Sequence, residues 1–455
     1  MVREHWSSRI GFVMAAAGSA IGLGTLWMFP FVTGENGGGL FVLLYLLCTL
    51  FIGFPIFIGE LLVGRLTQKG AVQSFIVLKG KNSFWNLTGY FGLAGAGFMM
   101  SYYSVVAGWG LNYIFLSTQA FWRGKTQAEI STVFDTLLSS GDIQVFWHAI
   151  FLALSISVLY SGLQKGIEYW SRLMTSSLFV LLLGLLGYSF QLDGFSQALH
   201  FIFWPDFTKL SPGGVLEALG LSFFTLSLGQ GVMITFGSYM KKEEDISKTA
   251  MIVVLMDIVV SLLIALMLFP MIFTYGFEPS SGPGLIFKVL PLVFSKMSGD
   301  ILLATAFFTL FVFTALTSSV ALIEVIVVYV METFHISRHY SCSLVGTALF
   351  VAGLPHCFEL FSNWTVLYSM SFFSVISMLV SNWILPIGGL LLSLFCGWAL
   401  PEKLLKEEFC STDSSRYFFY PWLFMIRYLA PLGTGLVLIY KAELIDLQEI
   451  VKIFL

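Results

Sequence analysis

The chain has 455 residues, of which 57% are apolar and only 11% are Asp, Glu, Lys or Arg. Soluble domains carry roughly 25% charged residues, so this chain has too few charges to cover the surface of a water-soluble protein. The net charge of −3 gives no reason to expect nucleic acid as a partner. The composition predicts an integral protein of the lipid bilayer, and nothing in it indicates an obligate protein partner.

Apolar runs long enough to cross the hydrocarbon, which takes about 20 residues, recur along the sequence. Because backbone groups in lipid must pair within their own segment, each run is predicted to be a helix. Together they predict one all-α membrane domain over residues 1–455, with 11 spans. The predicted spans are Ile10–Gly34, Asn36–Gly59, Asn82–Trp122, Ile143–Gln164, Leu173–Leu192, Ala218–Met240, Ile258–Phe277, Ile301–Ile323, Tyr340–Phe358, Leu360–Pro401 and Tyr417–Tyr440.

Lys and Arg residues set the expected orientation of the spans. With the N-terminus in the cytoplasm, the inner segments hold about twice as many of these residues as the outer segments. The sequence therefore predicts a multi-pass protein of the cell membrane with a cytoplasmic N-terminus.

The first and sixth predicted spans contain interior glycines: Gly18, Gly22 and Gly24 in the first, Gly229 and Gly231 in the sixth. Each interior glycine costs about 1 kcal/mol relative to alanine, so both helices are predicted to be interrupted within the membrane. Close packing through small residues is the alternative for either span alone. Glycine-interrupted spans at corresponding positions of two inverted halves indicate the binding site of a secondary transporter.

The eighth predicted span carries a run of hydroxyl side chains, at Thr314, Thr317, Ser318 and Ser319. Hydroxyls at this helical spacing can face one cavity. With carbonyls from a broken first span they would form an oxygen cage, which suits a hard cation such as sodium. The alternative is ordinary hydrogen bonding of these hydroxyls to the preceding turn.

These segments resemble the neurotransmitter:sodium symporters, in particular bacterial amino-acid transporters of the leucine-transporter type. The matching motifs are Arg3-Glu4-His5-Trp6, Ala17–Gly24, Phe29-Pro30, Glu35–Gly39, Phe223–Gly229 and Leu316–Ser319. The resemblance implies two inverted five-helix repeats, at about 9–192 and 213–397, with broken helices 1 and 6 and an extra helix at about 417–441. It also implies a bacterial inner-membrane protein that imports an amino acid together with at least one sodium ion.

The resemblance further implies a substrate pocket at the two helix breaks. The residues that it places there are Ala20, Gly22, Leu23, Gly24, Met99, Tyr103, Phe224, Thr225, Ser227, Gln230, Ser318 and Leu322. No acid or base in this set faces the substrate side chain, so a charged side chain would be left unpaired in a low dielectric. We therefore expect a neutral, leucine- or methionine-like substrate. As an alternative, Tyr103 and Phe224 are ordinary packing aromatics.

Two sodium sites follow from the same resemblance. The first, which is complete, consists of Gly18, Ile21, Thr314, Thr317 and Ser318. The second, which is altered, consists of Ala20, Thr25, Thr225 and Asp257. Relatives usually have asparagine where this chain has Thr25 and Asp257. Because a threonine hydroxyl lies closer to the backbone than an asparagine carbonyl, we expect Thr25 to fall short and this second site to be incomplete.

Asp257 is an acid between two apolar runs, and such acids usually mark an ion or proton route. Three interpretations stay open: it binds sodium directly, it carries a proton because burial disfavours its charged form, or it hydrogen-bonds broken backbone. Chloride-dependent relatives use Tyr, Gln and Ser nearby. Tyr45 and Ser261 fit that pattern, but Leu221 stands at the Gln position. Chloride dependence is therefore not expected.

An inner gate is implied at Arg3, Trp6, Tyr239 and Glu332, with an Arg3–Glu332 hydrogen bond that closes the cytoplasmic exit. The alternative is that these are ordinary interfacial charges. At the outer gate, Met28 replaces the family's usual arginine. The last long apolar run before residue 402 contains no acid, so this gate is expected to depend on packing.

Glu60 resembles the family acid that hydrogen-bonds the unwound backbone of helices 1 and 6; alternatively, it is a terminal charge that extends to the interface. The expected function is sodium-driven amino-acid uptake by alternating access. Proton-coupled or mixed coupling through Asp257 is the alternative. An enzyme or a channel is less favoured, since the sequence shows no nucleophile–base pair, metal cluster or repeated pore motif.

Overall fold

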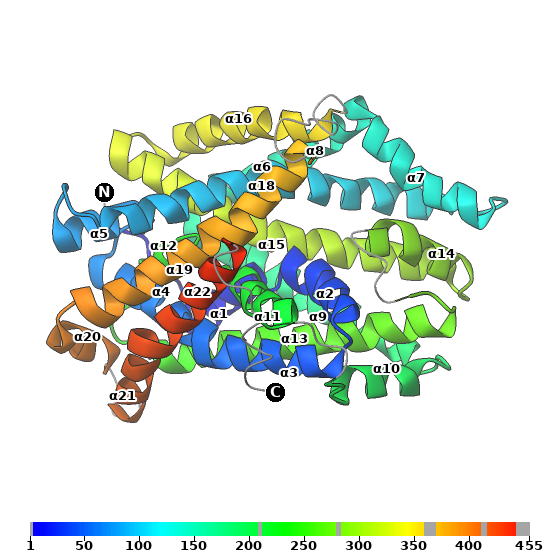
Figure 1. The fold of residues 1–455 in the computed structure, drawn as a ribbon. Helices are drawn as coiled ribbons and strands as arrows, with labels where there is room; N and C mark the ends of the chain where they lie inside the picture. The colour runs from blue at the N-terminus through cyan, green and yellow to red at the C-terminus, as the bar shows by residue number, and fades with distance from the viewer. Residues whose placement is uncertain (1–2, 208–211, 279–283, 359–369, 411–415, 443–455) are drawn as a thin grey trace.

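The computed structural model describes residues 3–207, 212–278, 284–358, 370–410 and 416–442, and these residues form helices and turns without a strand. The long helices lie side by side in one bundle (Figure 1). The N-terminus lies at one end of the bundle, with α5 (Ala71–Lys79) and α20 (Glu402–Phe409). The opposite end carries α7 (Gln127–Ser139), α10 (Phe195–Phe203) and α14 (Leu290–Ser295). We call these ends the N-terminal end and the far end.

Eleven helical segments of the described chain correspond to the predicted spans, and several contain a π-helical turn (η). The first six are α1 (Arg9–Ala20) with η1 (Gly24–Met28) and α2 (Phe29–Glu35); α3 (Gly39–Cys48) with η2 (Thr49–Gly53) and α4 (Phe54–Thr67); α6 (Asn86–Thr118); α8 (Gly141–Tyr160); η3 (Leu163–Glu168) with α9 (Tyr169–Ser189); and α11 (Pro212–Thr225) with α12 (Val232–Gly237). The last five are α13 (Ile246–Thr274); α15 (Asp300–Phe334); α16 (Arg338–Cys357); α18 (Phe372–Leu379) with η5 (Val380–Ile384), α19 (Leu385–Leu394) and η6 (Phe395–Ala399); and α21 (Arg416–Phe424) with η8 (Met425–Leu429) and α22 (Ala430–Lys441).

Eight of these segments are continuous helices long and apolar enough to cross a membrane, and the bent pair formed by α1 and η1–α2 makes a ninth in the described residues. The other two differ for identifiable reasons. The helix α6 has 33 residues, or about 50 Å at 1.5 Å per residue, but glycine, serine and tyrosine lower its hydropathy. The sixth span is divided into two short helices. If these two segments also cross the membrane, the described residues contain the predicted number of spans.

Several predicted span ends were wrong because they were placed at charged residues. The helix α13 continues through Asp257, and α15 continues through Glu324, both fully buried. The fifth span begins at Leu163, ten residues before its predicted start, and includes Glu168. An apolar run ends at any ionisable residue, whereas a helix continues when that residue has polar partners, as each of these acids does.

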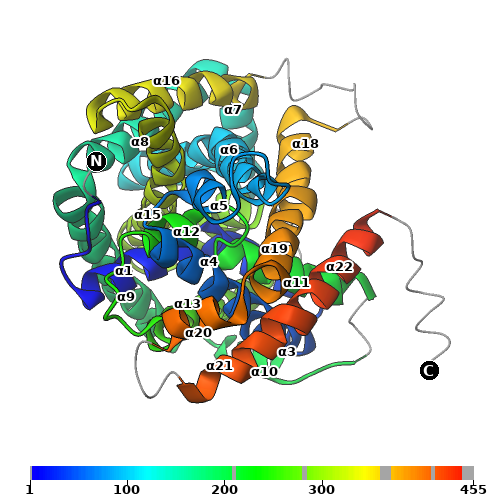
Figure 2. The ribbon, with the colours of Figure 1, turned by 90° about the vertical axis from the view of Figure 1, so that its left-hand side faces the viewer.

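The helix α15 lies at the centre of the bundle (Figure 2). In its most apolar stretch 89% of the residues are buried within the protein, compared with 33–61% for the other continuous spans. It packs against α6 and α9, and α1 packs against α9, α13 and α15. The broken first span therefore contacts the central helix that carries the hydroxyl run.

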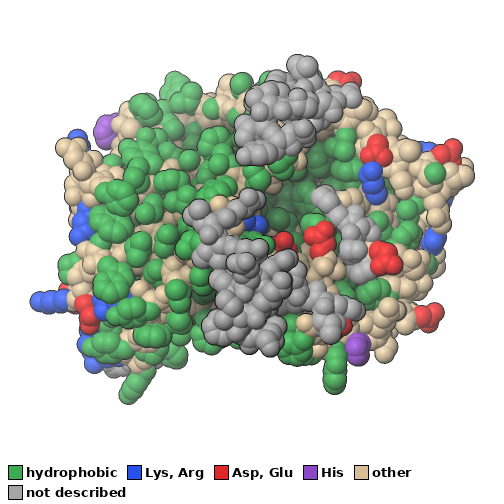
Figure 3. Space-filling view, viewed as in Figure 1, with side chains coloured by type: hydrophobic (Ala, Val, Ile, Leu, Met, Phe, Trp, Pro, Cys, Tyr) green, Lys and Arg blue, Asp and Glu red, His purple; other side chains and the backbone are tan. Residues whose placement is uncertain are grey.

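Apolar side chains cover the middle of the face shown in Figure 3, and charged side chains gather toward its two ends. Large side chains such as Val180, Leu183 and Val351 are more than half exposed on the described surface. A belt of this kind between charged ends is typical of a bundle surrounded by lipid.

Candidate functional site

The first span is interrupted between Ala20 and Gly24, where its two parts meet at an angle of 47°. At the break, the amide of Gly22 donates to the carbonyl of Ala20 at 2.9 Å, and the amide of Leu23 donates to the hydroxyl of Tyr103 at 3.2 Å. In a continuous helix these amides would bond to the carbonyls of Gly18 and Ser19. The break therefore releases two buried carbonyls toward α15 and the sixth span.

The sixth span is interrupted between Thr225 and Val232. Ser227, Gly229 and Gly231 have φ angles of 54°, 73° and 70°, in the left-handed region that only glycine adopts at low cost. The hydroxyl of Ser227 donates to the freed carbonyl of Ser19 at 3.0 Å. One hydrogen bond thus joins the two breaks directly.

The carboxylate of Glu60 accepts hydrogen bonds from the exposed amides of the sixth span, from Gly229 at 2.8 Å and Met233 at 3.2 Å. In the described part of the chain it makes no hydrogen bond to the first span, so its support of that break stays a prediction. A fully buried carboxylate with these partners fits backbone support better than a terminal surface charge.

Part of the predicted substrate pocket forms one contact group. A Cβ atom built on Gly22 would lie 2.4 Å from the Ser318 hydroxyl oxygen and 3.1 Å from the Tyr103 hydroxyl. One built on Gly24 would lie 2.4 Å from the ring of Phe224. Tyr103 and Phe224 also line a cavity of about 130 Å³ with Leu23, Trp27, Met28, Phe31, Tyr102, Val106, Phe373 and Ser377.

The remaining predicted pocket residues are buried but are not joined to this group by a hydrogen bond in the described structure; they are Met99, Gln230 and Leu322. Neither amide atom of Gln230 has a hydrogen-bond partner in the described structure, although the residue is only 1% exposed. Buried amides normally have partners. That the substrate side chain binds among these three residues therefore stays a prediction.

Most of the predicted first sodium site lies where α1 faces α15. The hydroxyl of Ser318 donates to the carbonyls of Ser19 at 2.9 Å and Gly18 at 3.4 Å. The hydroxyl of Thr317 donates to the carbonyl of Thr314 at 3.0 Å. The fifth predicted member, Ile21, is fully buried at the helix break. We call these five residues the neutral cluster, since none of them is ionisable.

The residues of the predicted second sodium site also lie together, and the expectation that the Thr25 hydroxyl does not reach a bound ion stays a prediction. The Thr25 hydroxyl donates to the Asp257 carboxylate at 3.0 Å and lies 3.3 Å from the carbonyl of Ala20. The hydroxyl of Tyr45 lies 3.1 Å from the other carboxylate oxygen and 3.0 Å from the hydroxyl of Thr225.

The contact between Thr25 and Asp257 joins η1 of the first span to α13. Ser261 lies 3.4 Å from Tyr45 and completes the set. We call these six residues the acid cluster: Ala20, Thr25, Tyr45, Thr225, Asp257 and Ser261.

The predicted inner-gate residues contact one another at the N-terminal end. The guanidinium of Arg3 forms an ion pair with Glu332 at 2.8 Å, hydrogen-bonds Ser238 and lies 4.4 Å from the ring centre of Tyr239. Trp6 is 1% exposed, and its indole donates to the carbonyl of Phe236 at 3.1 Å. These contacts tie the N-terminal segment to the inner half of the sixth span and to the end of α15.

The comparisons with known proteins agree with this geometry. The sequence model of the sodium:neurotransmitter symporter family matches residues 3–132 and 118–442. A sodium-dependent transporter of Bacillus subtilis, YhdH, is 38% identical over 436 residues, which cover 94% of this chain and 95% of the relative. A sodium-dependent transporter of Haemophilus influenzae is 33% identical, with 94% and 96% covered.

The chain belongs to the sodium:neurotransmitter symporter family. Among solved structures, that of MhsT in complex with L-phenylalanine has a TM-score of 0.89 and 36% sequence identity, and the match covers 96% of this chain and 99% of that one. The family resemblance, the all-α membrane fold with broken helices 1 and 6, and the classification as a transporter rather than an enzyme are confirmed. The repeat boundaries and the individual site residues stay predictions.

The sequence reasoning for this family member missed a second ion pair at the same end. Arg338 forms an ion pair with Glu324 at 2.6 Å, and Tyr239 donates to the same carboxylate at 2.5 Å. It also missed Glu168, which accepts a hydrogen bond from the amide of Ser7 at 2.8 Å. Both acids were visible as charges next to apolar runs, but no sequence pattern identified their partners.

Proposed function

We propose that this symporter imports a neutral, hydrophobic amino acid together with sodium by alternating access. The observation that carries the proposal is the meeting of the two helix breaks, where Ser227 bonds the freed carbonyl of Ser19 beside Tyr103 and Ser318. A zwitterion needs donors for its carboxylate and acceptors for its ammonium group within one site. The two breaks supply both from the backbone.

The substrate carboxylate would bind at the start of the outer half of the first span. The amide of Leu23 and the hydroxyl of Tyr103 lie there, at the N-terminal end of η1 and α2, where the helix dipole favours an anion. The ammonium group would bind carbonyls of Ala20, Phe224 and Thr225 with the hydroxyl of Ser227. The substrate would thereby bridge the first and sixth spans.

The substrate side chain would be neutral because Asp257, an acid close to the break, already has hydrogen-bond partners within the protein. Asp257 accepts from Thr25 and Tyr45, and the cavity beside Tyr103 and Phe224 is lined mainly by apolar and aromatic residues. A charged side chain there would cost several kcal/mol. The likeness to MhsT, which was solved with L-phenylalanine, supports a large hydrophobic side chain, as does our expectation of a leucine- or methionine-like one.

Sodium bound at the neutral cluster would couple the sodium gradient to the change between the outward-open and inward-open arrangements. An ion held jointly by α1 and α15 would favour the arrangement in which these helices touch. Opening of the inner side would require the Arg3–Glu332 ion pair to part. Coupling arises only if each ligand binds the two arrangements with different affinity, since equal binding shifts no equilibrium.

A second candidate is proton coupling, alone or mixed with sodium, through Asp257. Its support is the complete burial of this carboxylate within a membrane span, where its charge needs compensation. We also propose that the N-terminal end faces the cytoplasm of a bacterial cell, as the distribution of Lys and Arg predicts.

The test is uptake of labelled amino acids by the purified full chain in sealed proteoliposomes. With sodium outside and potassium inside, we expect accumulation of leucine, methionine or phenylalanine that competes with other hydrophobic amino acids but not with arginine or glutamate. Accumulation driven equally well by a proton gradient without sodium would favour the second candidate. No accumulation with any gradient would overturn the proposal.

A further inference from the structure

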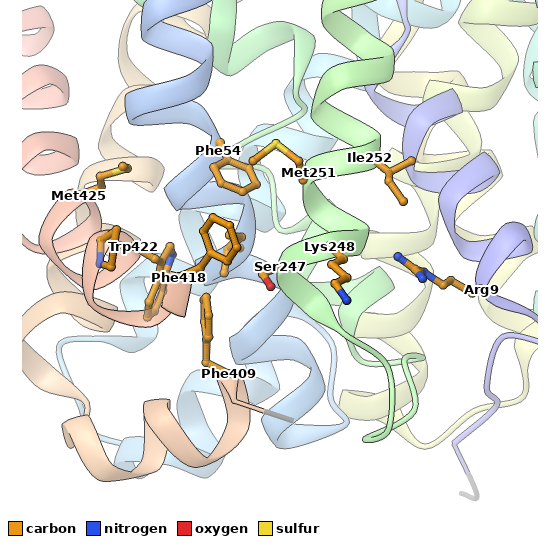
Figure 4. Close-up of a pocket in the computed structure, with 12 residues that line it drawn as sticks. Arg9, Phe54, Ser247, Lys248, Met251, Ile252, Phe409, Phe418, Trp422 and Met425 are labelled. Atoms are coloured by element: carbon orange, nitrogen blue, oxygen red, sulfur yellow. The ribbon is translucent and has the colours of Figure 1, made fainter. Parts of the chain in front are cut away.

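An open groove of about 330 Å³ lies between the second, seventh and eleventh spans near the N-terminal end. Figure 4 shows the side chains that line it, which come from α1, α4, α13, α20, α21 and η8. None of them belongs to the neutral cluster, the acid cluster or the substrate pocket. The groove is therefore a separate feature of the molecule.

The walls of the groove are apolar and partly open to the surroundings. Phe54, Met251 and Met425 face it, while Ile252 and Phe418 are 41% and 58% exposed. Pockets lined in this way along the side of a membrane bundle suit a hydrocarbon chain, because van der Waals contact with packed side chains replaces contact with mobile lipid. The shape alone does not decide which hydrocarbon binds.

Two cationic side chains lie on one side of the groove, so that side is positively charged and the rest is apolar. Arg9 begins α1 and Lys248 lies in the first turn of α13, and both side chains line the groove. Among the described residues, the guanidinium of Arg9 makes one hydrogen bond, to the Thr249 hydroxyl at 3.2 Å, and no ion pair.

Lys248 is 56% exposed and lies 3.8 Å from Asp245. That carboxylate also accepts from the Lys248 amide at 3.1 Å as the cap of α13, so it compensates the ammonium only in part. Glu244 also interacts electrostatically with Arg9, so the two cations keep part of their charge for an outside anion.

We propose that this groove binds an anionic phospholipid, with one acyl chain along the apolar wall and the phosphate between Arg9 and Lys248. Basic pockets between spans at the cytoplasmic side are suited to anionic head groups. The cations lie at the N-terminal end, so the lipid would come from the inner leaflet if the proposed orientation holds. The bound lipid would connect α1, which must move during transport, to α13 and the eleventh span.

A lipid fits the groove better than a second protein chain would. A protein segment would have to bury Arg9 and Lys248 beside an apolar wall, which is costly unless it brings its own acids. A phospholipid supplies a phosphate for Arg9 and Lys248 and a hydrocarbon chain for the apolar side chains beside them.

The experiment is native mass spectrometry of the delipidated full chain, titrated with phosphatidylglycerol or with phosphatidylcholine of identical acyl chains. We expect the first bound phosphatidylglycerol to be preferred over phosphatidylcholine. The double variant Arg9→Gln/Lys248→Gln should lose most of this preference, since each cation near an anionic head group is worth about fivefold in affinity. The matched control is Lys241→Gln/Lys242→Gln, which removes two exposed cations of the adjoining turn that do not line the groove.

A second pair of variants tests the acyl-chain wall. Met251→Trp would fill the groove and should weaken the first binding event for both lipids. Leu255→Trp, one turn further along α13 at a position 46% exposed and outside the groove, should leave it unchanged. Melting temperatures in detergent without added lipid would show that each variant is folded.

Three outcomes would overturn the proposal. The first is equal binding of the two lipids by the unmodified protein. The second is an equal loss of preference in the Lys241→Gln/Lys242→Gln control. The third is a dimer whose mass disappears in Met251→Trp, which would assign the groove to a second copy of the chain. Retention of lipid preference and its selective loss in Arg9→Gln/Lys248→Gln would support it.

Discussion

The neutral cluster and the acid cluster both include residues of the broken first span, but their buried polar groups are compensated differently. In the neutral cluster, hydroxyls of Thr317 and Ser318 satisfy carbonyls of α15 and the first span. In the acid cluster, hydroxyls of Thr25 and Tyr45 surround a carboxylate that is fully buried on α13. The first has no net charge to compensate, and the second does.

This difference predicts different behaviour toward cations. A cage of hydroxyls and carbonyls can close on itself when its ion leaves, because each donor finds an acceptor within the cluster. A buried carboxylate keeps an uncompensated charge unless a cation or a proton accompanies it. We therefore expect the neutral cluster to release its ion easily, whereas Asp257 holds a positive charge through more of the cycle.

The largest effect should come from Gly22→Ala, which would disturb the neutral cluster and the substrate pocket together. The added methyl group would lie 2.4 Å from the Ser318 hydroxyl and 3.1 Å from that of Tyr103. Overpacking costs about 1–3 kcal/mol, and here the strain would fall on ion and substrate contacts together, so we expect uptake to fall by more than about 100-fold. Gly97→Ala, on α6 with no atom within 4 Å of the new methyl group, is the matched control. Normal uptake by Gly22→Ala would mean that the ion and the substrate do not both depend on the break in the first span.

The next effect isolates the neutral cluster. In Thr317→Ala/Ser318→Ala, two ligand oxygens are lost. At about 1 kcal/mol each, their loss should raise the sodium concentration for half-maximal uptake about 30-fold. Thr309→Ala is the control, since its hydroxyl bonds only the preceding turn of the same helix, at Thr305. Sodium titrations of uptake in proteoliposomes measure the effect. Equal sodium dependence in the double variant and the control would show that the neutral cluster does not bind the transported sodium.

A smaller and more diagnostic effect is expected in the acid cluster from Asp257→Asn. If Asp257 binds sodium, losing its charge should weaken sodium activation about tenfold, or about 1.4 kcal/mol, with little change in pH dependence. If it carries a proton, the pH dependence of uptake should flatten while sodium activation persists. Ser261→Ala, which removes a hydroxyl in contact with Tyr45 rather than with the carboxylate, is the control. Unchanged dependence on both ions would leave Asp257 only the structural role of holding the hydroxyls of Thr25 and Tyr45.

The sequence was sufficient to predict the membrane class, the number of spans and the two breaks. Span length, charge and glycine content are local properties that a single sequence displays. The carbonyls freed at Gly18 and Ser19 follow from the break itself. The sequence placed Gly18 beside Ser318 but did not identify the Ser19 carbonyl, which Ser318 bonds at the shorter distance.

Distances between helices could not be predicted in the same way. The structure places the Thr25 hydroxyl against Asp257 of α13, and Tyr45 of α3 contacts the same carboxylate. No local sequence pattern specifies either contact, because each joins two different helices. The Glu324–Arg338 pair was missed because each residue marks the end of an apolar run, and only the packed structure shows that the two ends meet.

The smallest effect should come from Tyr45→Phe, which keeps the ring packing of the acid cluster and removes one hydroxyl. That hydroxyl lies within 3.4 Å of Asp257, Thr225 and Ser261. Losing a hydrogen bond to a charged group costs about 1.5 kcal/mol at the lower end, part of which the remaining Thr25 hydroxyl should recover. We therefore expect about a fivefold change in sodium activation, measured in the same uptake assay. Tyr113→Phe, which removes a hydroxyl bonded to the Phe287 carbonyl outside both clusters, is the control. If Tyr45→Phe were as damaging as Asp257→Asn, the compensation of the acid would depend on this hydroxyl rather than on a cation, and the proposed contrast between the clusters would fail.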